Sequence, residues 1–245
     1  MLLTSPPSPS KRLRELFSRA RLVLLDFDGP VCDLFAERSA PEIARRLCER
    51  IGPDGLRRAG IDEGVTDPLA VLLGTHRADP GDVSGLALAV RKLLAEEETL
   101  AAATAVPTPG AVHLMERLAG GGKLLGIASN NCVPAIRTHL DLHGLLAYVT
   151  DPGRPGDGHR IVGRHDDPDL MKPHPYALRT LLTATGTDPG DGVMIGDSPN
   201  DALAAAEAGV PFIGIHPDAA KRDALRAAGA ECLVDSMHVL AAAAA

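Results

Sequence analysis

Short apolar runs that stop abruptly at a polar residue constrain the fold of this chain more than any other feature. They do not alternate apolar with polar residues, which is typical of strands buried on both faces, as in a parallel sheet. The runs occupy residues 22–25, 124–128, 193–196 and 211–215, with a weaker candidate at 146–149. The sequence therefore predicts the strands of a buried sheet at these positions.

Stretches with the apolar spacing of helices lie between these runs. Helices are predicted at residues 12–20, 109–118, 134–142, 176–184, 199–208 and 218–228. Regular alternation of strands and helices is typical of parallel sheets with right-handed crossover connections. We therefore predict an α/β fold with a doubly wound, Rossmann-like and mostly parallel sheet.

One long segment after the first predicted strand does not follow this alternation. It contains no convincing strand, and Gly- and Pro-containing breaks divide it into three predicted helices. These helices are expected at residues 37–51, 68–76 and 83–100. We therefore predict two domains, which are an α/β core formed by residues 1–33 and 106–245 and a helical domain inserted at residues 34–105.

Composition argues against several classes of function. The 245 residues carry a formal net charge of −7, and only 2% of them are aromatic. Nucleic-acid binders normally have a basic excess and aromatic side chains for base stacking, so we expect no nucleic-acid partner. No run approaches the roughly 18 apolar residues of a membrane span. We expect a cytoplasmic protein without a membrane partner, and we interpret residues 1–10 as a disordered tail.

Polar residues at the ends of the predicted strands are the candidates for a functional site. In doubly wound sheets, ligands bind outside the carboxyl ends of the strands, so residues from different strands meet there. The candidates are Asp26, Asp28, Ser129, Asn130, Lys172, Asp197 and Asp201. Together they offer carboxylates, a hydroxyl group and an ammonium group around one crevice.

The segment Asp26-Phe27-Asp28-Gly29 is the sharpest local signal. Two carboxylates at positions i and i+2 of an extended backbone point to the same side, and Gly29 permits a tight turn. Like charges this close repel each other unless a cation neutralises them. A hard divalent ion with oxygen ligands fits, and Mg²⁺ is the usual one beside phosphates. An ordinary turn at a strand end is the alternative.

The second strong signal lies at residues 196–201. Ser198 suits a helix N-cap, Pro199 suits the first helical position, and Asp201 completes a pattern similar to a capping box. A well-capped helix explains these three residues but does not explain Asp197. The positive N-terminal end of the helix would also face the crevice.

Ser129-Asn130 and Lys172 are weaker signals when each is considered alone. A hydroxyl group beside a helix N-terminus can hold a phosphate, although simple capping is the alternative. Lys172 is one of only five lysines in the chain, against twenty arginines. A composition that prefers Arg but keeps a Lys here indicates that a compact ammonium group is needed, with an ordinary surface Lys as the alternative.

Taken together and in this order, these segments resemble the four motifs of the haloacid dehalogenase-like (HAD) hydrolase superfamily. Residues 26–29 look like its first motif, Ser129-Asn130 like the second, Lys172-Pro173 like the third and residues 196–201 like the fourth. The helical insertion is similar to the small helical cap of phosphoglycolate phosphatase-like members. Two departures are Pro30, where the family often has Thr, and Met171, where Gly is frequent.

The resemblance implies Mg²⁺-dependent hydrolysis of a phosphate monoester of a small metabolite through an aspartyl-phosphate. Asp26 would be the nucleophile, and Asp28 the acid and base. Ser129, Asn130 and Lys172 would hold the phosphoryl group. Asp26, Asp28 through its backbone carbonyl, and Asp197 would be the metal ligands. Asp201 would support the metal site or Lys172.

Other members of the superfamily remain as alternatives. Haloacid dehalogenases lack a residue like Asp28, and phosphonoacetaldehyde hydrolases need a cap lysine, for which Lys92 in an apparent surface helix is a poor candidate. A sugar phosphomutase, or a catalytically weak regulatory or binding protein, shares the core motifs and stays open. The sequence identifies neither the substrate nor the oligomeric state. The polar candidates on the cap are Arg38, Arg45, Arg46, His76 and Arg77.

Overall fold

The computed structural model describes residues 9–62, 64–151 and 158–244. One six-stranded sheet forms its centre, with the strand order β3-β2-β1-β4-β5-β6, and neighbouring strands pair in parallel throughout. The strands are β1 Leu22–Leu25, β2 Leu124–Ala128, β3 Ile161–Val162, β4 Gly192–Gly196, β5 Phe212–Ile215 and β6 Cys232–Val234. The predicted doubly wound α/β fold is confirmed.

β1 shows why an uninterrupted apolar run forms a central strand here. All four of its side chains are fully buried, because successive residues point to opposite faces of the sheet and both faces are covered. Val23 and Leu25 belong to one hydrophobic cluster, and Leu22 and Leu24 belong to another. Each face therefore has its own layer of helices.

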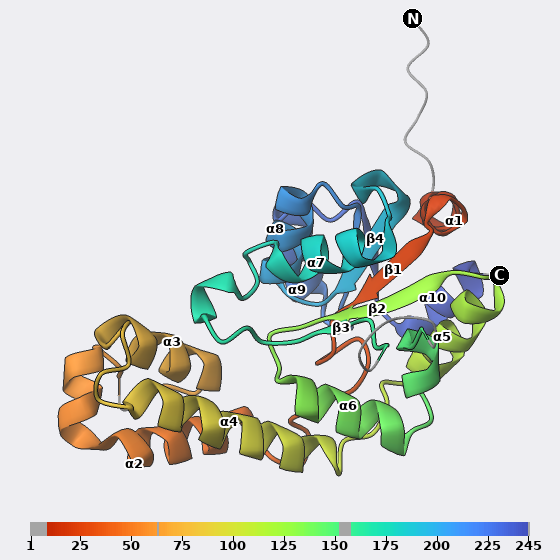
Figure 1. Cartoon of the computed structure of the whole chain (residues 1–245). Helices are drawn as coiled ribbons and strands as arrows, with labels where there is room; N and C mark the ends of the chain where they lie inside the picture. The colour runs from red at the N-terminus through yellow and green to blue at the C-terminus, as the bar shows by residue number, and fades with distance from the viewer. Residues whose placement is uncertain (1–8, 63, 152–157, 245) are drawn as a thin grey trace, which may run out of the picture.

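Helices cover the two faces of the sheet in separate groups (Figure 1). α1, α5, α6 and α10 contribute to the cluster on the Val23 face, and α7, α8 and α9 contribute to the other. Their bounds are α1 Pro9–Arg19, α5 Ala111–Gly120, α6 Val133–Leu142, α7 Tyr176–Thr185, α8 Pro199–Ala208, α9 Ala219–Ala227 and α10 Met237–Ala243. Short 3₁₀ helices are η1 Leu146–Val149, η2 Pro168–Leu170 and η3 Pro189–Asp191.

Three helices between β1 and α5 form a group beside the sheet, at the lower left of Figure 1. They are α2 Ala40–Ala59, α3 Pro68–Ala78 and α4 Leu86–Ala102, and they share a hydrophobic cluster that Met171 of the sheet domain also joins. α2 is kinked at Gly52, which has a φ of 73°, at the predicted Gly-Pro break. α4 runs from this group to the sheet domain, where Ala101 and Ala102 join the cluster of the core. We call residues 34–105 the helical insertion.

The structure differs from the sequence prediction at several short elements. Residues 146–149, the weaker strand candidate, form the 3₁₀ helix η1, because this apolar run follows the α6 C-terminus through a tight turn that buries Val149 against the core. β3 and β6, with two and three residues, were not predicted as strands. α1 begins at Pro9, inside the predicted tail, and the rest of that tail lies outside the described residues.

No helix in the described ranges combines the length and the apolar character that a membrane crossing requires.

Candidate active site

The carboxyl ends of β1, β2 and β4 surround a cavity of about 390 Å³ between the sheet and the helical insertion. β1 lies between the other two strands, so the segments that follow these three strands meet at one edge of the sheet. Six of the seven predicted site residues line this cavity, namely Asp26, Asp28, Ser129, Asn130, Lys172 and Asp197. The seventh, Asp201, is fully buried and bonds directly to Lys172.

Lys172 joins two of the buried carboxylates. Its Nζ lies 2.8 Å from Asp26 Oδ1 and 2.5 Å from Asp201 Oδ1, and it also donates to the backbone oxygen of Ala128 at 2.9 Å. Burial alone would lower the pKa of Lys172, but attraction to Asp201 and Asp26 raises it above its usual range. The ammonium group therefore stays charged and offsets part of the negative charge around it.

Asp26 and Asp28 have pKa values well above those of ordinary carboxyl groups. Burial and repulsion by Asp201 raise the pKa of Asp26 to about 6, against the opposing effect of Lys172. Burial raises the pKa of Asp28 to about 7, although its Oδ1 accepts a hydrogen bond of 2.9 Å from the backbone N–H of Leu34. Asp28 can therefore take up and release a proton near neutral pH.

Asp197 lies directly against the turn that follows β1. A Cβ atom on Gly29, which has a φ of +94°, would lie only 2.4 Å from Asp197 Oδ2, so this turn requires glycine for both its conformation and its close approach. Burial, and then repulsion by Asp26, raise the pKa of Asp197 to about 8. The Asp197 carboxylate therefore lies in a crowded negative field.

The carboxylates could hold a metal ion. One oxygen each from Asp26, Asp197 and Asp201 lie within 4.8 Å of one another. Burial, and then repulsion between neighbouring carboxylates, raises the pKa values of Asp26 and Asp197, and a divalent cation would offset that repulsion. An all-oxygen donor set with mutual repulsion fits a hard cation such as Mg²⁺.

The N-terminus of α8 holds Asp201 in place through the predicted capping pattern. The Ser198 hydroxyl accepts from the backbone N–H of Asp201, and Asp201 Oδ2 accepts from the backbone N–H of Ser198 at 3.0 Å. This reciprocal pair leaves Asp201 Oδ1 directed at Lys172. Asp201 therefore caps α8 and positions the ammonium group at the same time.

A chain of buried hydrogen bonds that the sequence did not predict supports Ser129. The Ser129 hydroxyl donates to Asn131 Oδ1 at 3.0 Å, and Asn131 Nδ2 donates to Glu98 Oε1 at 3.2 Å. Glu98 on α4 forms a two-bond ion pair with Arg164, with distances of 2.7 and 2.9 Å, and both side chains are almost fully buried. The helical insertion is thus connected to the loop after β2.

Asn130 connects the loop after β2 to the Lys172 segment. Its Nδ2 donates to the backbone oxygen of Lys172 at 3.0 Å, and its Oδ1 accepts from the backbone N–H of Lys172 at 2.8 Å. Both polar atoms of the Asn130 side chain therefore fix the backbone of Lys172. In this arrangement the side chain positions the ammonium group rather than pointing at a ligand.

The polar residues predicted as candidates for ligand recognition on the helical insertion lie away from the lining of the cavity. Arg38 and Arg46 pair with Glu97, and Arg45 pairs with Glu49. The remaining two also lie elsewhere: His76 faces Asp167, with 3.8 Å between Nε2 and Oδ1, and Arg77 lines a different cavity.

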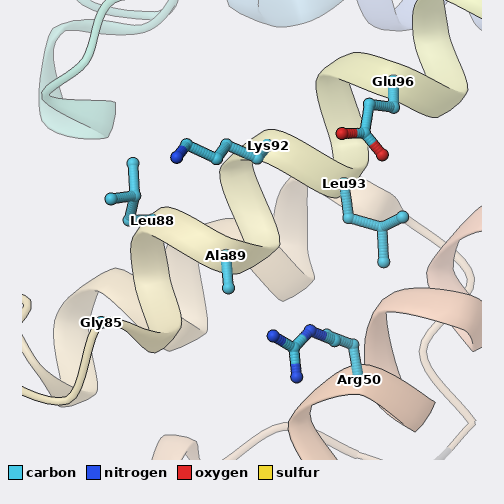
Figure 2. A pocket seen from close by; sticks show the side chains of 7 residues that line it. All are labelled: Arg50, Gly85, Leu88, Ala89, Lys92, Leu93 and Glu96. Carbon is cyan, nitrogen blue, oxygen red and sulfur yellow. The ribbon is translucent and has the colours of Figure 1, made fainter.

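Lys92 also lies elsewhere, in a separate pocket between α2 and α4 (Figure 2). Its side chain extends from α4 away from Arg50 on α2, and neither residue lines the cavity at the strand ends. This position gives no support to a Schiff-base role for Lys92.

Comparisons with known proteins agree with this arrangement. The model of the haloacid dehalogenase-like hydrolase family matches residues 20–209. A phosphoglycolate phosphatase of Rhodospirillum rubrum is 29% identical over an alignment of 203 residues, and the match covers 79% of this chain and 78% of that protein. A Dickeya dadantii protein named "Probable phosphatase IndB" is 28% identical and spans 91% of this chain and 93% of its own length.

A solved structure shares the fold. The crystal structure of a hydrolase from Pseudomonas syringae covers 90% of this chain and 95% of its own, with a TM-score of 0.62 and 20% identity. The family match spans all four motifs and most of the chain. The chain therefore belongs to the haloacid dehalogenase-like hydrolase family.

Proposed function

We propose that this protein is a Mg²⁺-dependent phosphatase that cleaves the phosphate monoester of a small metabolite through an aspartyl-phosphate on Asp26. The observation that carries the proposal is the pair Asp26 and Asp28 in one cavity, with Lys172 bonded to the first and a pKa of about 7 on the second. The phosphatase names of the relatives support the same class of enzyme.

Asp26 and Asp28 have different tasks in this mechanism. Asp26 attacks phosphorus in line, and its bond to Lys172 favours the ionised form that attack requires. Asp28 gives a proton to the departing alcohol oxygen and later takes one from the water that attacks the aspartyl-phosphate. A pKa of about 7 suits a group that must be acid in one step and base in the next.

The remaining site residues bind charge and hold the two aspartates in place. Ser129 and Lys172 hold the phosphoryl oxygens, with Asn130 fixing the loop that carries Lys172. Asp26, the backbone carbonyl of Asp28, and Asp197 would hold Mg²⁺, which neutralises phosphoryl charge when bound. Asp201 supports Lys172 from behind.

The helical insertion acts as a cap over the cavity in this proposal. It contributes Phe35, Thr66 and Leu69 to the lining, so it covers the side where the leaving group would lie. The two crossings between insertion and sheet domain lie side by side, because Cys32 pairs with Pro107 and Thr108 Oγ1 donates to Gly29 O. Paired crossings suit a hinge whose closure excludes water.

The test is a screen of the purified protein against phosphorylated metabolites with Mg²⁺ and then with excess EDTA. We expect release of inorganic phosphate that depends on Mg²⁺ and disappears in Asp26→Asn. A sugar phosphomutase would instead return an isomeric sugar phosphate without free phosphate. A regulatory protein would bind a phosphorylated compound without turnover, and either result would contradict the proposal.

A further inference from the structure

The wall that the helical insertion gives to the catalytic cavity is apolar and acidic. Its members are Phe35, Ala40, Thr66, Asp67, Pro68 and Leu69, with Glu98 at the border with the sheet domain. Among the described residues that line this cavity, the only cation is Lys172, on the sheet side. A leaving group in this cavity would therefore face no Arg, Lys or His of the insertion.

Lys172 in the lining and Arg164, the partner of the lining residue Glu98, are already bonded to carboxylates. Arg164 makes both of its short bonds with Glu98, and Lys172 lies between Asp26 and Asp201. Neither cation is therefore available to pair with a carboxylate on the leaving group. In the proposed mechanism, Lys172 also binds the phosphoryl oxygens. Binding of a second anion would thus leave that anion without a counter-charge.

The N-terminus of α3 borders the cavity and would normally attract an anion, but a carboxylate of the protein already lies there. Pro68 at the first helical position has no N–H group. The next N–H, that of Leu69, donates to Asp67 Oδ1 at 2.8 Å. The Asp67 carboxylate therefore occupies this helix end and places a negative charge where a substrate carboxylate would otherwise bind.

We propose that the substrate's leaving group is a small alcohol without an anionic group, and that an amine on it is favoured by Asp67. This inference rests on the proposed phosphatase function and names its substrate class. It separates the protein from a phosphoglycolate phosphatase, whose leaving group, glycolate, carries a carboxylate. Phe35 and Leu69 would contact the carbon part of the alcohol, while Asp67 would attract the amine.

Three phosphate esters with two-carbon leaving groups test the inference, with para-nitrophenyl phosphate as the reference for turnover. They are phosphoethanolamine, ethyl phosphate and 2-phosphoglycolate, whose leaving groups are cationic, neutral and anionic. We expect kcat/KM to fall in that order, with 2-phosphoglycolate at least about tenfold below ethyl phosphate because of like-charge repulsion. A higher kcat/KM for 2-phosphoglycolate than for ethyl phosphate would overturn the inference.

Asp67→Asn identifies the residue that causes the preference. Asn also caps helices well, so the fold of α3 should persist. The ratio of kcat/KM for phosphoethanolamine to that for ethyl phosphate should fall, and the ratio for 2-phosphoglycolate to ethyl phosphate should rise. Asp62→Asn is the matched control, because Asp62 makes the same local bond, to Gly64 N, but does not line this cavity. Equal ratios in wild type and Asp67→Asn would refute the role of Asp67.

Turnover of the reference substrate distinguishes failure of this inference from failure of the proposed phosphatase function. Hydrolysis of para-nitrophenyl phosphate with Mg²⁺, together with a preference for 2-phosphoglycolate, would leave the phosphatase function intact and remove only this inference. Absence of turnover with para-nitrophenyl phosphate and with all three esters would remove both.

Discussion

Asp197 has a higher pKa than either Asp26 or Asp28, and this makes it a sensitive probe of the crowded carboxylates. Its folded pKa of about 8 lies above the usual aspartate pKa of 3.8, so the folded protein holds this proton more tightly than the unfolded chain. The contribution of this proton to the stability of the fold is complete below the unfolded pKa and is lost as pH rises through about 8. Without metal, Asp197→Asn should therefore become increasingly more stable than wild type between pH 5 and pH 8.

Thermal melts of both proteins in EDTA and in Mg²⁺ measure this difference. Mg²⁺ should raise the Tm of wild type more than that of Asp197→Asn at pH 8, because the substitution removes one proposed ligand. Asp191→Asn, at an exposed position before the same strand, should show neither trend. A constant difference across pH, with equal gains from Mg²⁺, would argue against a metal ligand at this position.

Outside the predicted motifs, we expect substitution of Glu98 to lower the free energy of unfolding more than any other substitution. Glu98→Gln leaves the buried Arg164 without its charged partner, and breaking a buried pair typically costs about 3–5 kcal/mol. It also loosens Asn131, which holds the Ser129 hydroxyl. We expect a loss of that order in the free energy of unfolding, and a raised KM in the fraction that stays folded.

Urea unfolding of Glu98→Gln beside Glu96→Gln gives the comparison. Glu96 lies two residues away on the same helix but is exposed, so its substitution should change the free energy of unfolding by less than about 0.5 kcal/mol. Similar values for the two variants would mean that the buried pair contributes little.

At the scale of residues, the sequence predicted six residues that line the cavity but not the buried residues that support them. Asp26, Asp28 and Asp197 were predicted because each follows an apolar strand, and ligands bind at the carboxyl ends of such strands. Nothing in the run Glu96-Glu97-Glu98 shows that Glu97 and Glu98 are buried and Glu96 exposed, and the partner of Glu98, Arg164, lies far along the chain. Asn131 could have been noted because it directly follows Ser129-Asn130.

Among the elements, α8 has a first turn that stabilises the helix and also holds a site residue, Asp201. Ser198→Ala removes the hydroxyl that accepts from the backbone N–H of Asp201, which typically costs about 1 kcal/mol. It should also release Asp201, so turnover should fall more than stability alone explains. Ser236→Ala is the matched control, because Ser236 precedes α10 as an N-cap without a side-chain capping bond. Equal effects of the two substitutions on unfolding in urea would contradict this account.

Strands with four or five residues in an apolar run were predicted, and the shorter strands were not. β1, β2, β4 and β5 have four or five residues with an uninterrupted apolar pattern. β3 has only two residues, and it is a strand because β2 lies beside it. Residues 146–149 have the composition of a strand but fold as η1, since a short apolar run does not distinguish the two structures.

For the whole molecule, the hydrophobic cluster of the helical insertion, to which the sheet domain adds only Met171 among the buried residues described, predicts a unit that opens independently of the sheet. Leu72 in this cluster and Leu24 in the sheet are both fully buried, so substitution by Ala should cost about 2–5 kcal/mol at either site. Leu72→Ala should speed amide hydrogen exchange in α2, α3 and the first half of α4 only. Leu24→Ala should speed exchange throughout the sheet domain.

Mass spectrometry of the exchanged peptides tests this difference. If Leu72→Ala accelerated exchange equally in β1 and β4, the insertion and the sheet would be one cooperative unit. The domain boundaries at residues 33–34 and 105–106 stay a prediction. The core cluster includes Leu34, Ala101, Ala102 and Ala105, so packing alone would end the insertion slightly inside that range.

The most direct test separates the roles of Asp26 and Asp28 in pre-steady-state reactions with excess para-nitrophenyl phosphate. Asp26→Asn should abolish nitrophenol release, because it removes the nucleophile. Asp28→Asn should still release nitrophenol, since this leaving group departs without a proton, but the second step should slow by about 10²–10⁴-fold.

The account predicts a burst of nitrophenol approaching one equivalent in Asp28→Asn, with a phosphoprotein that is stable to acid and sensitive to hydroxylamine. An alkyl phosphate, whose leaving oxygen needs the proton, should give no burst. Equal loss with both substrates and no trapped phosphoprotein would contradict the assignment of Asp26 as nucleophile and Asp28 as acid and base.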